Sequence, residues 1–277
     1  MIFFVGLTKL FAAMFGICSV PVAPVYASPT DRSAMVSQIL AGEKIEVLEL
    51  EDPWIMVLNQ NDHVRGWVDR KMFEELFEGE DNAFAGKPTG VIKPPMYCAR
   101  DQYGRNFYLP GGSRLYQHGS SIAVAPGRNL EGDVRQHIFM PAYTSGKEIV
   151  TTALLFNGAP YLRGGKTIFG MDNSGLIQIS CCLNGIRIPR SLEDQVETGT
   201  VVSFNEEAQP GDIAFFETAE GSIIHAGFVM DGGRIVHAYG EVRVDLFDHE
   251  GIFNKHTRQY THKLRVIKRI HEPHVHN

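Results

Sequence analysis

The stretch from Gly164 to Leu183 reads GGKTIFGMDNSGLIQISCCL and combines a glycine-rich loop with an apolar run. The apolar residues recur with helical rather than alternating spacing. Asp172 is a favoured residue type at a helix N-cap, and Gly185 is a favoured one just past a helix end. The stretch therefore predicts a buried helix over residues 173–183. Free backbone N–H groups and the helix dipole stabilise an anion in its first turn, which is typical of a catalytic thiolate. The residue there is Asn173, and a carboxamide is a poor nucleophile.

The composition indicates a folded protein that does not bind nucleic acid. The 277 residues are 44% hydrophobic, which is enough for one large domain or two to three small ones. The net charge is −6, and no basic stripe is present that would neutralise phosphates. The four cysteines have neither zinc-ligand spacing nor the density of a disulfide framework. We therefore expect no metal and no cofactor, and a partner that is a small molecule, a peptide or a protein.

The N-terminal segment, residues 1–17, is apolar, and Lys9 is its only charged residue. It resembles a signal peptide, but no basic region precedes the apolar run. Cleavage after Ala27 would also remove a predicted strand. Met14 offers an alternative start, so the segment is either signal-like or an over-extended N-terminus. We expect a cytoplasmic protein, with export to the periplasm or cell surface as the alternative, and no transmembrane span because the run is too short.

The chain divides into two regions of short strands and one mixed region. Residues 18–77 contain short strand-like runs separated by Gly and Pro, a pattern that indicates a small β-barrel. Residues 78–140 contain a Glu-, Asp- and Gly-rich linker and weaker strand-like runs, which we interpret as a second barrel of this kind. Residues 141–270 are α+β, with helices first and an antiparallel sheet after them. Residues 271–277 form a histidine-containing tail that we expect to be solvated.

The mixed region contains two histidines on adjacent predicted strands. Asp231-Gly232-Gly233 is a hairpin signal between the strands Ile223–Met230 and Arg234–Tyr239. If these three residues form the loop, His225 lies opposite Tyr239, and His237 is its diagonal neighbour on the same face. Two imidazoles in this arrangement suit a general base and the group that orients it.

Five motifs, in this order, resemble the NlpC/P60 family of cell-wall cysteine peptidases. They are Pro160-Tyr161-Leu162-Arg163-Gly164-Gly165 for the family's PYLWGG, Asp172-Asn173-Ser174-Gly175 for its DCSG, Pro210-Gly211-Asp212 and the apolar strand that follows, His225-Ala226-Gly227 for its HVG, and Ile235-Val236-His237-Ala238 for its IIHA. The order of residues 18–77 resembles a bacterial SH3 (SH3b) domain, on the Gly-Glu-Lys turn at 42–44, Trp54 and Gly66-Trp67-Val68. The resemblance implies small β-barrel SH3b domains followed by a papain-like α+β NlpC/P60 domain.

The resemblance also implies the roles of individual residues. Position 173 is that of the catalytic cysteine, lost here to asparagine, His225 that of the base and His237 that of the second histidine. Six further residues match the substrate groove: Tyr161, Arg163, Asp172, Ser174, Ser191 and Leu192.

Three of these positions depart from the family pattern besides Asn173. Arg163 stands where the family has tryptophan. Ser191 and Leu192 stand where γ-D-glutamyl-L-diamino-acid endopeptidases with SH3b domains carry an Asp and a Ser that hold the free amine of L-Ala-γ-D-Glu. The acidic anchor for an ammonium group is therefore absent.

Three functions are compatible with this pattern. The first is a catalytically silent, peptide-binding or muropeptide-binding pseudoenzyme. The second is an active γ-D-glutamyl-L-diamino-acid endopeptidase in which Asn173 is an engineered or erroneous replacement of cysteine. The third is a structural or protein-interaction role in which the groove is unused or remodelled. The departures at Arg163, Ser191 and Leu192 favour the first, because a recent inactivating change would leave those positions family-like.

Overall fold

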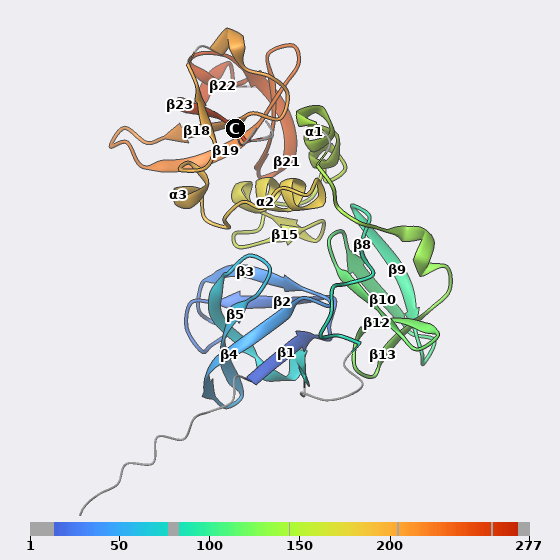
Figure 1. Ribbon diagram of the computed structural model, residues 1–277. Helices are drawn as coiled ribbons and strands as arrows, with labels where there is room; N and C mark the ends of the chain where they lie inside the picture. The colour runs from blue at the N-terminus through green and yellow to red at the C-terminus, as the bar shows by residue number, and fades with distance from the viewer. Residues whose placement is uncertain (1–13, 77–82, 144, 204, 256, 271–277) are drawn as a thin grey trace, which may run out of the picture.

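The computed structural model describes residues 14–76, 83–143, 145–203, 205–255 and 257–270. These residues form three antiparallel seven-stranded sheets, one for each third of the chain, with α-helices only around the last (Figure 1). Short 3-10 helices lie at Arg70–Met72 beside the first sheet and at Val134–His137 beside the second. The apolar segment before Met14, the first half of the predicted linker and the tail 271–277 lie outside the described residues. The expected domain boundaries stay predictions.

The first sheet is a strongly curved, barrel-like set of short strands in the order β3-β2-β6-β5-β4-β1-β7. The alternating residues of its strands enclose a core that includes Cys18, Val25 and Val57. Its strands are β1 (Met14–Cys18), β2 (Val22–Tyr26), β3 (Met35–Leu40), β4 (Lys44–Glu51), β5 (Trp54–Asn59), β6 (Arg65–Asp69) and β7 (Phe73–Leu76).

Strand β1 differs from the prediction, which placed the start of this unit at Cys18. Met14–Ile17 are already in the sheet, because β1 pairs with both β4 and β7 and buries Ile17 and Cys18 completely. An apolar run next to a signal-like segment cannot be distinguished by composition from an apolar central strand.

The second sheet has the order β10-β9-β13-β12-β11-β8-β14 and packs beside the first. The Tyr116 hydroxyl donates a hydrogen bond of 2.9 Å to the carbonyl of Gly42 in the first sheet. Gly42 has a φ of +75°, and a side chain there would collide with the backbone of Arg114. The strands are β8 (Gly90–Ile92), β9 (Met96–Asp101), β10 (Asn106–Pro110), β11 (Arg114–His118), β12 (Ser121–Ala125), β13 (Arg128–Glu131) and β14 (Ile138–Phe139).

The third sheet has the order β17-β23-β18-β19-β20-β21-β22, and its edge strand β22 also pairs with β23. Helices α1 (Gly146–Leu154) and α2 (Asn173–Leu183) pack on one face, where most of the apolar core lies. The strands are β17 (Thr200–Val202), β18 (Ile213–Glu217), β19 (Ile223–Met230), β20 (Arg234–Tyr239), β21 (Glu241–Phe247), β22 (Gly251–Asn254) and β23 (Gln259–Arg269). The short hairpin β15 (Lys166–Thr167) and β16 (Gly170–Met171) and helix α2 face the first sheet (Figure 1).

The helix predicted over residues 173–183 is confirmed, with the predicted residues at both of its ends. Helix α2 covers residues 173–183, and the Asp172 carboxylate caps it by accepting from the Gly175 N–H at 2.7 Å. Gly185 follows the helix with a φ of +73°. Leu192–Gln195 form the single-turn helix α3 with Ser191 as its N-cap.

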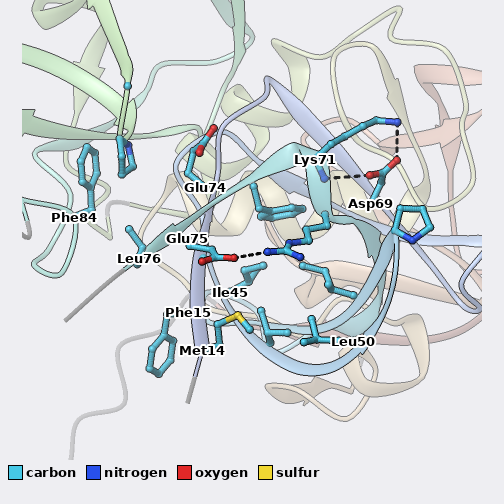
Figure 2. Close-up of a pocket in the computed structure, with 18 of the residues that line it drawn as sticks. Met14, Phe15, Ile45, Leu50, Asp69, Lys71, Glu74, Glu75, Leu76 and Phe84 are labelled. Carbon is cyan, nitrogen blue, oxygen red and sulfur yellow. Dashed lines mark hydrogen bonds and ion pairs between the residues drawn. The ribbon is translucent and has the colours of Figure 1, made fainter. Parts of the chain in front are cut away.

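A separate groove of about 1120 Å³ lies between the first sheet and residues of the second unit, among them Phe84 and His118, and contains none of the predicted site residues (Figure 2). Met14, Phe15, Ile45, Leu50 and Leu76 give it an apolar floor. Two ion pairs, Arg70–Glu75 and Lys71–Asp69, border it. Across the described ranges, no helix is long and apolar enough to cross a membrane.

Candidate active site

The first turn of α2 places Asn173 against strand β19. The Asn173 side-chain oxygen accepts from the Ser174 backbone N–H at 2.7 Å, and its Nδ2 group lies 2.8 Å from Nδ1 of His225. Because the backbone N–H can only donate, the carboxamide must present its NH₂ group to the imidazole. Asn173 is 7% exposed, so these hydrogen bonds satisfy a nearly buried amide.

A chain of hydrogen bonds continues from Asn173 to Asp245. His225 Nε2 lies 2.8 Å from His237 Nδ1, and His237 Nε2 lies 3.1 Å from the Asp245 carboxylate. The carboxylate accepts from His237 Nε2–H, so His237 Nδ1 accepts from His225 Nε2–H and His225 Nδ1 accepts from Asn173. The predicted contact between the two histidines is confirmed. Their catalytic roles stay predictions.

The hairpin that carries the histidines has the predicted register. Residues 231–233 form its loop, Met230 pairs with Arg234, and Gly227 pairs with His237. Gly227 has no room for a side chain, because a Cβ there would lie 2.8 Å from the Cβ of His237. The glycine after His225 therefore allows the second imidazole to lie against the first strand.

A buried ion pair holds the loop before α2. Arg190 Nη2 lies 2.9 Å from Asp172 Oδ2 and 3.2 Å from the carbonyl of Gly165, and Arg190 Nη1 lies 2.5 Å from the Ser174 hydroxyl. Asp172 also accepts from the backbone N–H of Gly164 at 2.7 Å. Asp172 and Ser174, which the sequence assigned to substrate, are thus largely occupied by internal partners.

A groove of about 1210 Å³ runs between the first sheet and the α2 region, and seven of the nine predicted site residues line it. The other two, His225 and His237, are 3% and 0% exposed and lie beneath its floor. The opposite wall comes from the first sheet and includes Met35, Val36, His63 and Arg65. The seven lining residues are Tyr161, Arg163, Asp172, Asn173, Ser174, Ser191 and Leu192.

Comparison with known proteins identifies the two kinds of unit. Residues 158–263 match the NlpC/P60 family, and residues 25–72 match the bacterial dipeptidyl-peptidase Sh3 domain. The chain carries an NlpC/P60 domain that follows a bacterial SH3 domain. The NlpC/P60 family is a family of cell-wall peptidases, and the fold predicted from the motifs is confirmed.

The chain is similar to named peptidases along most of its length. It is 26% identical to the gamma-D-glutamyl-L-lysine dipeptidyl-peptidase of Bacillus subtilis (strain 168), over 73% of this chain and 71% of that protein. It is also 26% identical to dipeptidyl-peptidase 6 of Lysinibacillus sphaericus, over 82% of this chain and 90% of that protein. The crystal structure of an NlpC/P60 family protein from Bacillus cereus superposes with a TM-score of 0.79 at 16% identity, covering 93% of this chain and 100% of the other.

Three residues of the NlpC/P60 site were not predicted from the sequence. Asp245 lies two residues beyond the partner of His237 on β21, and the register of that hairpin would have placed it beside His237. Arg190 was given no role from the sequence, because its burial and its pairing with Asp172 appear only in the folded structure. His262 stacks on His225 with ring centroids 4.1 Å apart, and its strand β23 was not predicted. The alternation of His262, Leu264 and Val266 with polar residues was the available signal.

The environment of the NlpC/P60 histidines favours neutral imidazoles. Burial lowers the pKa of His225 well below 6.5, and the nearby His262 and His237 lower it further. Burial and then His237 lower the pKa of His262 to about 4, while Asp245 opposes this shift. A neutral His225 whose Nδ1 is an acceptor is the form that takes a proton from a nucleophile.

No cysteine in the described part of the chain replaces the missing nucleophile. Cys181 and Cys182 lie near the far end of α2, and burial raises the pKa of both thiols. Cys18 is fully buried in the first sheet, where burial raises its pKa to about 12. The described residues also contain no group of three or more His, Cys, Asp or Glu side chains arranged to hold a metal ion.

Proposed function

We propose that this protein binds a peptide of the cell-wall type in the groove of its NlpC/P60 domain and does not cleave it. The observation that carries the proposal is the Asn173 carboxamide, which occupies the nucleophile position and donates to Nδ1 of His225 at 2.8 Å. In a cysteine peptidase this nitrogen takes the thiol proton and leaves a thiolate that attacks the peptide carbonyl. A carboxamide has no proton to give up near neutral pH and forms no acyl-enzyme.

The choice of a peptide ligand rests on the groove and on the relatives. The groove is about 1210 Å³, is lined by both units and has Asn173 in its lining. It has the size of sites that bury a ligand of several residues. The relatives that share most of this chain's length are named as dipeptidyl-peptidases, and one of them as a gamma-D-glutamyl-L-lysine dipeptidyl-peptidase.

One observation favours a second function, that of a cysteine hydrolase whose residue 173 is naturally cysteine. His225, His237 and Asp245 are joined by hydrogen bonds of 2.8 Å and 3.1 Å in the order that a working base requires. A site with no past or present catalytic use has no need to align three groups in this way. A thiol at position 173 would find its proton acceptor in place.

The test is hydrolysis and binding of L-Ala-γ-D-Glu-L-Lys by the native chain, by Asn173→Cys, and by Asn173→Cys with His225→Ala. We expect the native chain to bind the peptide without release of free lysine, and Asn173→Cys to release lysine. The variant that also lacks His225 is the matched control, because it has the thiol without the base and should lose about 10²-fold or more of the rate.

Two results would contradict the proposal. Release of lysine by the native chain would show that the site is active without a thiol. Absence of binding to every variant, with native folding confirmed by circular dichroism, would show that the groove does not take this class of peptide.

A further inference from the structure

The groove of the NlpC/P60 domain has a wall of unpaired arginines. Arg65, Arg163 and Arg187 line it and are exposed. None of the three makes a side-chain hydrogen bond or ion pair with another residue in the described ranges. Their charges are therefore available to a ligand.

Two of the carboxylates in the groove are already neutralised from inside the protein. Asp172 pairs with the buried Arg190 at 2.9 Å, and Asp62 pairs with the buried Lys166 at 3.0 Å. A ligand ammonium group would have to compete with these buried cations for either carboxylate.

The remaining acidic groups lie on a different part of the rim. Glu193 and Asp194 belong to α3, which packs on β19. Arg163, by contrast, precedes Gly164, whose Cα lies directly against the backbone carbonyl of Met35 in the first sheet. Arg65 and Arg163 thus lie along the first sheet, Arg187 lies in the segment that follows α2, and the two carboxylates lie beside β19.

Position 191 offers no acid to the ligand either. The Ser191 hydroxyl donates to the Asp194 carboxylate at 2.7 Å and accepts from the Asp194 N–H, so it serves as the cap of α3. Next to it, Leu192 presents an apolar side chain to the groove. Positions 191 and 192 therefore contribute no charge to the groove, and among the described residues that line it the carboxylates without an ion pair are those of Glu193 and Asp194.

We propose that the ligand places a carboxylate, and no free ammonium group, against the wall formed by Arg65, Arg163 and Arg187. The ligand class is an acidic peptide or an N-acylated peptide with an anionic end. This inference rests on the proposed function, since it concerns the same groove. Three arginines within one groove attract an anion and repel a cation, and the preference is electrostatic and screened by salt.

The experiment compares two forms of one probe by isothermal titration with the native chain. The probes are L-Ala-γ-D-Glu-L-Lys with a free N-terminal amine and the same peptide with an N-terminal succinyl group. We expect the succinyl form to bind about tenfold more tightly at low salt. The preference should shrink as NaCl rises from about 50 mM to about 500 mM. Arg163→Glu should abolish or reverse the preference, whereas Arg100→Glu, an exposed unpaired arginine on β9, should leave it unchanged.

The outcomes separate this inference from the proposed function. Equal binding of both probes, or a preference that Arg163→Glu does not alter, overturns the charge preference and leaves peptide binding in place. Tighter binding of the peptide with the free N-terminal amine also overturns the charge preference. If neither probe binds, the charge preference and the proposed peptide binding are both overturned. The Asn173→Cys hydrolysis assay then tells whether the groove admits the peptide at all.

Discussion

At the scale of single residues, His225 and His262 make the fold sensitive to acid. The pKa of His225 is well below 6.5 and that of His262 is about 4, in both cases mainly because of burial. In the unfolded chain both imidazoles titrate near about 6.5. Below that pH the unfolded state binds more protons than the native state, so stability is lost as the pH falls from about 6.5 toward 4. We expect the Tm to decrease through this window.

The substitution His262→Gln tests whether these histidines cause the acid sensitivity. It removes one of the two imidazoles whose pKa is lower in the native state than in the unfolded state. The Tm of this variant should depend less steeply on pH between about 6.5 and 4 than that of the native chain. His249→Gln, at an exposed histidine, is the matched control and should keep the native slope. Equal slopes for the native chain and His262→Gln, measured by thermal unfolding at several pH values, would contradict the assignment.

At the scale of elements, the start of α2 depends on one buried ion pair. Arg190→Met leaves the Asp172 carboxylate, 7% exposed, without its cation and with neutral donors only, namely two backbone N–H groups and the Ser174 hydroxyl. Removal of one partner of a buried pair typically costs about 3–5 kcal/mol of unfolding free energy. Arg70→Met breaks an exposed pair and should change little. Adding Asp172→Asn to Arg190→Met should recover part of the loss in urea unfolding, and no recovery would contradict a charge-based cause.

The same element shows which parts of the site could be predicted from the sequence. Local signals predict helix α2 and the β19–β20 hairpin. For the helix they are its N-cap residue and the helical spacing of its apolar residues, and for the hairpin they are its two glycines in the turn. Arg190 lies 18 residues along the chain from its partner Asp172, and His262 lies 37 residues from His225, so no local signal connects either pair. Strand β23 alternates charged residues with apolar ones, and no strand was predicted there from the sequence. Its place beside β18 follows from sheet assembly rather than from its own residues.

At the scale of the whole molecule, the groove exists because the SH3 domain and the NlpC/P60 domain are held together. Lys166 of β15 is 3% exposed and lies 3.0 Å from Asp62 and 3.6 Å from Glu43, both in the first sheet. Its backbone N–H also donates to Gln38 of β3 at 2.8 Å. Sequence alone could not show this, because Lys166 is separated by about 100 residues from its partners and lies in a stretch that predicts only a loop.

Lys166→Met should therefore weaken the interface between the two domains and the groove along with it. The change leaves Asp62 and Glu43 partly buried without a cation, which typically costs about 3–5 kcal/mol. We expect a lower midpoint of urea unfolding and faster hydrogen exchange at the Lys166 and Gln38 amides. Peptide affinity should fall as well, because one wall of the groove is no longer fixed. Lys147→Met, at an exposed lysine 3.6 Å from Asp231, is the control. Native exchange rates at these amides in Lys166→Met would show that apolar packing alone holds the two domains, and the groove would then not depend on the charge of Lys166.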